Sequence, residues 1–192
     1  GTLVSDKALG FTFAKNSHMS RLTKWINDPA YDNTGERVIL RVGNTMYDMT
    51  RSSAVFEKDK AVWYSQVQGM RCSVEVTLLE NSYAKRIRVN FENGVKGDVQ
   101  LAFYCEPVLG TSVKHPGGYV YNVEDDVITV YNPFCENGQM GKMYVACSEK
   151  AVFTNDRAAF LCGDFSEKVK PCVCDGCMAA ICRLEDCTGK KT

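Results

Sequence analysis

Apolar and polar residues alternate along much of the chain with a period of two. The segment Ser73–Leu78 alternates valine and leucine with polar residues, and Arg86–Phe91 and Val99–Cys105 continue the pattern. Successive side chains of a strand point to opposite faces, so the pattern predicts strands with one buried and one solvent-facing side. The residues expected on the buried side are Val74, Val76, Leu78, Ile87, Val89, Phe91, Val99, Leu101, Phe103 and Cys105.

Turn signals and further short apolar runs extend this pattern over the rest of the chain. Asn93-Gly94, Gly117-Gly118 and Asn137-Gly138 separate the runs, as turns between strands do. Further strands are expected at Arg37–Val42, Ala61–Gln66, Tyr119–Val123, Val127–Tyr131, Met143–Cys147, Ala151–Phe153, Ala159–Cys162 and Met178–Leu184. Together they predict an all-β fold, a large antiparallel β-sandwich with few or no helices, and a single domain over residues 1–192.

Composition argues against several functional classes. The 192 residues carry 23 basic and 23 acidic side chains, so the net charge is zero. This balance is atypical of nucleic-acid-binding proteins and of proteins that bind membrane surfaces through charge. No apolar run reaches the roughly 18 residues of a membrane span. Several of the ten cysteines occupy apolar strand positions, unlike those of a short, loop-rich disulfide framework. We therefore expect reduced thiols and a cytoplasmic protein.

The densest group of polar and aromatic residues lies in the segment from Asn16 to Pro29. It combines amide, hydroxyl, guanidinium and indole groups and has neither a helical nor a strand period. Planar polar side chains pair with the vicinal hydroxyls of a sugar, and an aromatic ring packs on its apolar face. A surface loop in which Asn and Asp residues make turns has the same composition. The residues alone leave both interpretations open.

The same segment resembles a motif of the inverting β-glucan phosphorylases. The matching residues are Asn16-Ser17, Arg21-Leu22-Thr23, Trp25, Asn27-Asp28-Pro29, Asp32 and Gly35-Glu36. They are similar to the "NS…RLTxWxNDP…D…GE" stretch of 1,2-β-oligoglucan phosphorylases and of the phosphorylase-like end of cyclic β-1,2-glucan synthases. Cellobiose and chitobiose phosphorylases are more distant relatives of this group.

Three further landmarks of that family follow in order along the chain. Tyr104–Gly110 resembles the stretch "Y-x-E-x-V-L-G", and Tyr131–Phe134 resembles "N-P-F/Y-N". Asp156–Leu161 resembles "D-R-x-x-F-L-G". Because the resemblance covers nearly the whole chain in order, it is much more specific than a single motif.

The resemblance implies a β-sandwich that a catalytic (α/α) barrel follows. In such enzymes the barrel holds the general acid, an aspartate, and the phosphate that attacks the anomeric carbon directly with inversion. The chain has no helical array, so we expect a fragment of a longer multidomain enzyme, an accessory domain without catalytic residues, cofactor or metal. Its expected partners are a β-linked gluco-oligosaccharide and the barrel of the same chain, and a homodimer is left open. The alternatives are a stand-alone carbohydrate-binding module and a purely structural sandwich that supports a barrel or a dimer.

The resemblance also indicates which residues bind the sugar: Arg21, Trp25, Asn27, Asp28 and Asn16. The guanidinium of Arg21 would hold two adjacent hydroxyls, and the indole of Trp25 would stack on the sugar ring. In the alternative interpretation, Trp25 packs into a domain interface and Asp28 caps a turn.

Five cysteines crowd the segment Cys172–Cys187. Cys174 and Cys177 have the C-x2-C spacing of a zinc knuckle, but neither a second such pair nor a nearby histidine follows. We therefore expect no metal site there and interpret Cys182 as a small apolar strand residue. The acidic run Glu124–Asp126 is expected to be a solvated turn rather than a calcium site.

Overall fold

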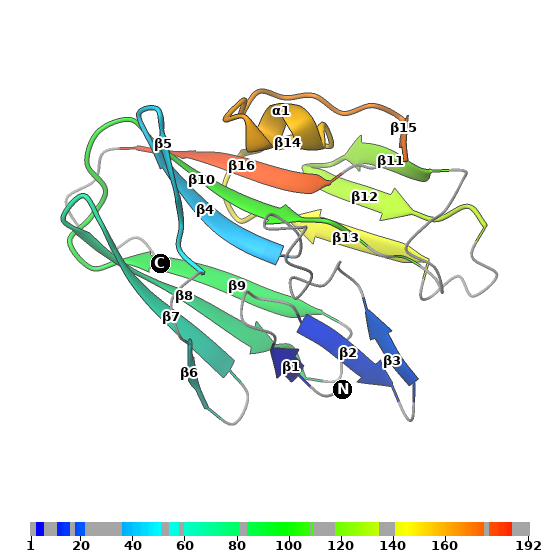
Figure 1. Ribbon diagram of the computed structural model, residues 1–192, viewed down its shortest axis with the longest axis horizontal. Coiled ribbons are helices and arrows are strands. Elements are labelled where there is room, and N and C mark those ends of the chain that lie inside the picture. The colour runs from blue at the N-terminus through cyan, green and yellow to red at the C-terminus, as the bar shows by residue number, and fades with distance from the viewer. Residues whose placement is uncertain are drawn as a thin grey trace.

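The computed structural model describes residues 3–5, 11–15, 18–21, 36–50, 54–57, 60–80, 84–107, 109, 118–134, 141–174 and 177–185. For residues 3–21 it gives the course of the strands only, and the side chain of Leu78 lies outside the description. The described part of the chain forms antiparallel strands and one short helix (Figure 1). The all-β fold predicted from the sequence is confirmed.

The described strands form four antiparallel sheets. The central sheet runs in the order β14 (Ala151–Thr154), β16 (Met178–Leu184), β10 (Val99–Cys105), β4 (Glu36–Val42) and β5 (Thr45–Asp48). The β8 sheet contains β6 (Ala54–Phe56), β7 (Lys60–Val67), β8 (Met70–Leu78) and β9 (Lys85–Phe91). The β12 sheet contains β13 (Lys142–Ala146), β12 (Val127–Tyr131), β11 (Tyr119–Glu124) and β15 (Cys172–Val173). The N-terminal sheet contains β1 (Leu3–Ser5), β2 (Phe11–Lys15) and β3 (His18–Arg21).

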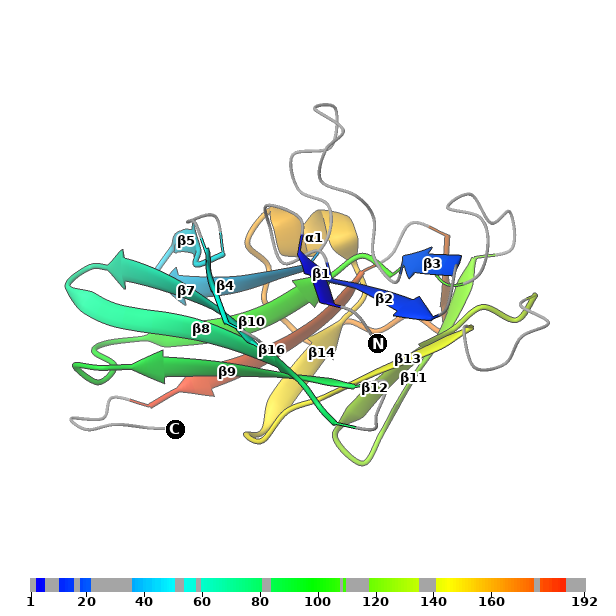
Figure 2. The same cartoon turned by 90° about the horizontal axis from the view of Figure 1, so that it is seen from below.

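The β8 sheet and the β12 sheet cover the same face of the central sheet. Strand β10 contributes Val99 and Leu101 to the core under the β8 sheet and Cys105 to the core under the β12 sheet. Phe103 packs against both cores, which joins them into one continuous interior. Figure 2 shows β7, β8 and β9 lying beside β11, β12 and β13.

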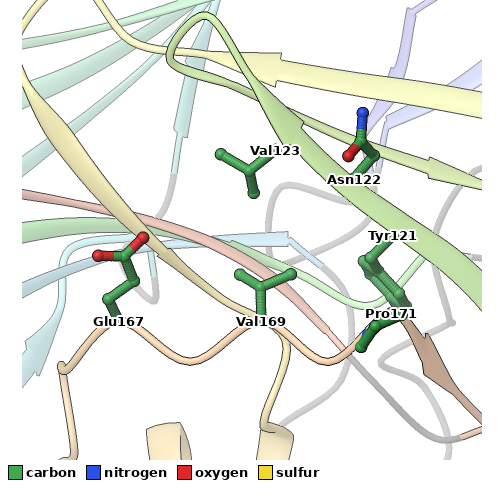
Figure 3. Close-up of a pocket in the computed structure, with 6 residues that line it drawn as sticks. All are labelled: Tyr121, Asn122, Val123, Glu167, Val169 and Pro171. Atoms are coloured by element: carbon green, nitrogen blue, oxygen red, sulfur yellow. The ribbon is translucent and has the colours of Figure 1, made fainter.

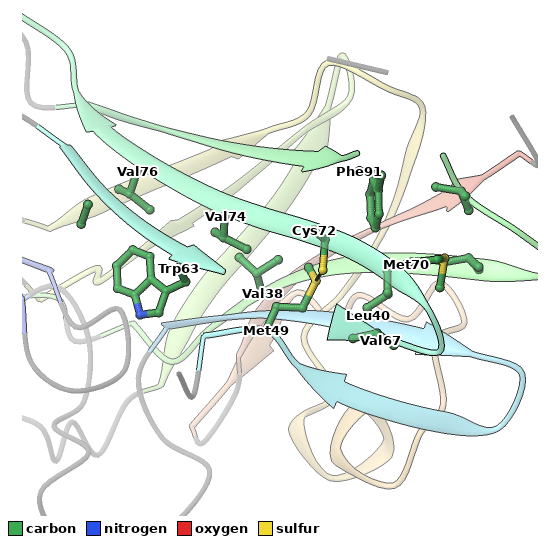
Figure 4. Close-up of a cluster of buried hydrophobic side chains, with 13 residues drawn as sticks. Val38, Leu40, Met49, Trp63, Val67, Met70, Cys72, Val74, Val76 and Phe91 are labelled. Carbon is green, nitrogen blue, oxygen red and sulfur yellow. Dashed lines mark hydrogen bonds between the residues drawn. The ribbon is translucent and has the colours of Figure 1, made fainter. Parts of the chain in front are cut away.

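The core under the β8 sheet is built from the alternating residues of the sequence pattern (Figure 4). Val74 and Val76 are buried, and Trp63 lies opposite Val74 in the strand pair with 1% of its surface exposed. The predicted core residues Ile87 and Val89 pack against the same cluster but are only half-buried, as are Leu101 and Phe103. Truncating a buried aromatic such as Trp63 typically costs about 3–5 kcal/mol, so this cluster anchors the sandwich.

The opposite face of the central sheet is also buried, so the expectation of one solvent-facing side is wrong for β10. Ala102 and Tyr104, which point away from the sandwich core, are both fully buried. They lie beneath helix α1 (Arg157–Leu161), and the ring of Phe160 stacks on Tyr104 with 4.9 Å between ring centroids. A nearly continuous apolar run, such as Leu101–Cys105, is typical of a strand that is covered on both faces.

Helix α1 replaces a strand that was predicted at Ala159–Cys162. Asp156 caps the helix, since its Oδ1 accepts a hydrogen bond from the backbone N of Ala159 at 3.1 Å. An aspartate before an apolar run is a helix start signal, whereas periodicity alone cannot assign so short a run. In the described part of the chain, no helix is both long enough and apolar enough to cross a membrane.

Part of the segment from Asn16 to Pro29 forms a strand, although the segment shows no strand period in the sequence. Its residues His18–Arg21 form β3, which pairs with β2 in the N-terminal sheet. Strand β3 has a single apolar residue, Met19, and so shows no alternation of apolar and polar residues. The short strands β1, β2, β5, β6 and β15 were not predicted either.

Two of the predicted turns are confirmed. Gly94 follows β9 with φ of 73°, and Asp125 and Asp126 have φ of 50° and 59°. Two successive positive φ values are typical of the two-residue hairpin turn that joins β11 to β12. Both aspartates are exposed, so the acidic run is a solvated turn. Gly117 and Asn137-Gly138 lie outside the described residues.

Candidate functional site

One end of the central sheet gathers the described residues of the three later sequence landmarks. Cys105, the last residue of β10, pairs with Glu36 of β4 and with Met178 of β16. The residues that follow β10 and β14 leave the sheet at this end, which we call the landmark end. Segment 22–35 joins the sheet here as well, because Glu36 is the first residue of β4.

A fully buried carboxylate, Glu106, lies at the centre of the landmark end. The hydroxyl of Tyr104 donates a hydrogen bond to Glu106 Oε1 at 2.5 Å, and Arg157 Nε donates to the same oxygen at 3.0 Å. Burial, together with the negative charge of Glu106, raises the pKa of Tyr104 far above its ordinary value, so the phenol remains a donor. Glu106 has no exposure to solvent, and its two hydrogen bonds tie the residue after β10 to Tyr104 and to helix α1.

A second buried polar cluster holds Leu109 beside Tyr119. The backbone N of Leu109 donates to Tyr119 Oη at 2.9 Å, and the carbonyl of Leu109 accepts from Asn132 Nδ2 at 2.8 Å. Both Tyr119 and Asn132 are buried. The landmark stretch that contains Leu109 is therefore bound to the stretch that contains Asn132.

An ion pair at the landmark end joins the central sheet to the β8 sheet. Lys85 Nζ of β9 donates to Glu36 Oε2, and the two side chains are 11% and 1% exposed. Glu36 is also the last residue of the motif that begins at Asn16. Removing one partner of a buried pair leaves the other charge buried without a counter-ion, which typically lowers the free energy of unfolding by about 3–5 kcal/mol. The pair therefore fixes the point at which segment 22–35 enters the sheet.

The five residues predicted to bind sugar fall outside the side chains that the structure describes. Arg21 is the last residue of β3, and its backbone lies opposite β2. Asn16, Trp25, Asn27 and Asp28 lie outside the described residues altogether. That these five residues bind a sugar together therefore stays a prediction.

The two cysteines with zinc-knuckle spacing occupy different environments. Cys174 is exposed, whereas Cys177 is fully buried, and burial raises the pKa of its thiol to about 12. Cys182 lies in the core under the β12 sheet, as predicted for a small apolar residue. Cys187 lies outside the described residues. Among those that are described, no three His, Cys, Asp or Glu side chains are placed to hold a metal ion.

An open hollow of about 430 Å³ lies between β11 and the segment that leads to β15 (Figure 3). Its lining consists of Tyr121, Asn122, Val123, Glu167, Val169 and Pro171. Tyr121 is only 4% exposed, so its ring presents no open face to a ligand. The hollow offers one carboxylate and one amide without an aromatic platform, which makes it a poor sugar site.

The pairing of Glu106 with Arg157 was not predicted, although both residues belong to landmark stretches. Glu106 follows Tyr104 by two positions, and this spacing puts both side chains on the same side of an extended chain. An acidic residue directly after a run of five apolar residues signals a buried charge, and a buried charge requires a partner. The sequence could have indicated the need for that cation but not its identity.

Comparisons with known proteins place these landmarks in one family. The family model of the glycosyl hydrolase 94 supersandwich domain matches residues 1–175. A curated relative is the cyclic beta-(1,2)-glucan synthase NdvB of Rhizobium meliloti (strain 1021), which is 25% identical over 150 residues. That match covers 70% of this chain and 5% of the relative, so the chain spans only a small part of the relative's length. Since the family model extends over most of the chain, the chain belongs to the glycosyl hydrolase 94 supersandwich-domain family.

Proposed function

We propose that this chain is a single, non-catalytic accessory domain of a glycoside phosphorylase or a related glycosyltransferase. In this proposal the landmark end faces the catalytic (α/α) barrel of the same enzyme and helps to form its binding site for a β-linked gluco-oligosaccharide. The observation that carries the proposal is the convergence of the described residues of three landmark stretches on one end of the central sheet, through the bonds of Glu106 to Tyr104 and Arg157 and of Leu109 to Asn132.

The connections of the sandwich support this orientation. The opposite end of the central sheet is closed between β4 and β5 by the two-residue turn Gly43-Asn44. The adjacent hairpin of β7 and β8 is closed by the two-residue turn Gln68-Gly69. Two longer connections attach near the landmark end. Segment 22–35 precedes β4, and segment 106–118 connects the end of β10 to the start of β11. Binding residues are carried more often by such connections than by tight turns.

The sugar-binding residues of the proposal are Arg21, Trp25, Asn27, Asp28 and Asn16. Arg21 binds adjacent hydroxyls with its guanidinium fork, and Trp25 supplies a stacking face. The two asparagines and Asp28 fix the segment or bind further hydroxyls. The buried Glu36–Lys85 ion pair supports this assignment, because it ties the C-terminal side of the motif to the landmark end.

The proposal assigns the chemistry to the barrel and none to this domain. Direct attack by phosphate needs one carboxylic acid and a phosphate site, and Glu106 is too deeply buried to act as that acid. The purified chain, incubated with β-1,2-gluco-oligosaccharide and inorganic phosphate, should therefore release no glucose 1-phosphate. The intact enzyme should release it under the same conditions. Release by the chain alone, in constant ratio to the protein through further purification, would refute the assignment.

We also propose a reducing, cytoplasmic environment for the domain. Cys72, Cys105 and Cys177 are reduced and buried in the sandwich. Burial raises the pKa of each of these thiols. They pack as small apolar residues and need no disulfide for their place in the core.

A further inference from the structure

We propose that the outer face of the β8 sheet is a second carbohydrate-binding surface, separate from the landmark end, that takes a neutral β-linked glucan chain. This surface lies on the side of β7 and β8 that faces away from the central sheet (Figure 1). The inference goes beyond the proposed function, because it concerns a site on this chain that acts without the barrel.

The register of the strands gathers the side chains of this surface. Tyr64 and Gln66 of β7 lie opposite Ser73 and Arg71 of β8, and Asn90 of β9 lies opposite Ser73. We call these five residues the outer platform. Their neighbours in sequence, such as Trp63 and Val74, point into the core, so the pleat turns the platform residues outward.

An exposed aromatic ring and an open hollow meet on the outer platform. Tyr64 is 59% exposed, and the hollow beside it has a volume of about 300 Å³. The lining of the hollow includes Tyr64, Gln66 and Arg71, together with Glu92 just beyond β9. An aromatic ring next to amide, guanidinium and carboxylate groups is the combination that holds the apolar face and the hydroxyls of a sugar.

The charges of this face favour an uncharged ligand. Arg71 and Glu92 line the same hollow. On the same face, Glu75 lies 4.0 Å from Arg88 and 3.6 Å from Lys60. Because positive and negative groups alternate, no field of one sign is available to attract an anion or a nucleic acid. A neutral polyhydroxyl chain therefore matches the surface better than a phosphate does.

The platform is held rigid by its strands. The turn between β7 and β8 is tight, and Gln68 Nε2 within it donates to Tyr47 Oη of β5 at 3.0 Å. Tyr64 and Gln66 are two positions apart on one strand, so their side chains are spaced by about 7 Å along the surface. A site that is formed before binding loses little conformational freedom when a ligand binds.

Tyr144 of β13 provides a matched control on the β12 sheet. It is 62% exposed, as open to solvent as Tyr64, but it does not line the hollow of Figure 3 or the hollow beside Tyr64. If any exposed tyrosine on a sheet bound sugar, the two residues would behave alike.

The test is isothermal titration calorimetry of the purified chain with linear β-1,2-gluco-oligosaccharides. Tyr64→Ala and Arg71→Ala should each weaken binding at least tenfold, while Tyr144→Ala should bind as the unaltered chain does. Because Tyr64 and Arg71 are exposed, their variants should keep the unaltered melting temperature. Calorimetry measures binding and requires no phosphorolysis. A failure of this second site can therefore be told apart from a failure of the proposed function.

Several outcomes would overturn the inference. They are the absence of binding by the unaltered chain at millimolar oligosaccharide and unchanged binding by Tyr64→Ala. Displacement of the oligosaccharide by inorganic phosphate would identify an anion site instead. A dimer in sedimentation that Tyr64→Ala dissociates would assign the face to a second copy of the chain.

Discussion

Buried polar side chains fix the landmark end at the scale of single residues. Glu106 accepts hydrogen bonds from Tyr104 and Arg157, and Glu36 accepts from Lys85. Each carboxylate gives up hydration, which costs free energy unless charged partners satisfy it. A sandwich that needed only stability could replace such groups with apolar ones. Their position suggests that they serve to hold the chain at that end in one geometry.

Replacing Glu106 with glutamine tests this arrangement. The variant keeps the shape of the side chain but leaves Arg157 without a carboxylate, so the free energy of unfolding should fall by about 2–4 kcal/mol. Urea denaturation of the chain measures the loss. Glu124→Gln, at an exposed position next to a turn, is the control and should leave stability unchanged. A fall of the same small size in both variants would contradict the role of Glu106.

Long strands were predictable from the sequence and short elements were not. In β8 and β9 the alternation repeats often enough to identify the buried side, and Val74 and Val76 lie there. The alternation gave the wrong exposure for one face of β10, because α1 covers that face. That coverage is a tertiary contact between distant parts of the chain, which periodicity does not report. Helix α1 itself was not predicted, because its start is signalled by a single residue, the capping Asp156.

The cap of α1 makes the stability of the folded chain depend on pH. The backbone N–H of Ala159, and after it Lys168, lower the pKa of Asp156 from 3.8 to about 2. Because the pKa is lower in the folded protein than in the unfolded one, the stabilisation is complete above about pH 4. It should disappear as the pH falls from about 4 towards 2, where the folded protein also takes up the proton.

The variant Asp156→Asn isolates this contribution. Its amide oxygen can still cap the helix, but it neither titrates nor attracts Lys168, which lies 3.0 Å from Asp156 Oδ2. The melting temperature of the variant should be a few degrees lower near neutral pH, and the difference from the unaltered chain should shrink between pH 4 and 2. Thermal melts across that range measure it. Parallel curves, with a constant difference, would rule out the ionised cap.

Across the whole molecule, the two ends of the sandwich differ in what they carry. The landmark end combines the buried carboxylates with long connections, whereas two-residue turns close the β4–β5 and β7–β8 hairpins at the other end. The sequence indicated the family landmarks and their order, and the fold shows that the described residues of the three later landmarks lie at the same end of the central sheet as Glu36. The positions of Arg21 and Trp25 were not predictable from the sequence, because single residues in a non-periodic segment give no pattern that fixes where they lie.

The most direct test of the account is the kinetics of phosphorolysis by the intact enzyme with Arg21→Ala. The account predicts that kcat/KM falls ten- to a hundredfold, since a lost charged hydrogen bond to substrate costs about 1–3 kcal/mol. Arg183→Ala is the matched control. Arg183 lies at the opposite end of the central sheet, is 75% exposed and pairs with Asp98 at 3.0 Å, so its loss should leave kcat/KM unchanged. Unaltered kinetics in Arg21→Ala, at an unaltered melting temperature, would contradict the claim that this part of the domain forms the sugar site.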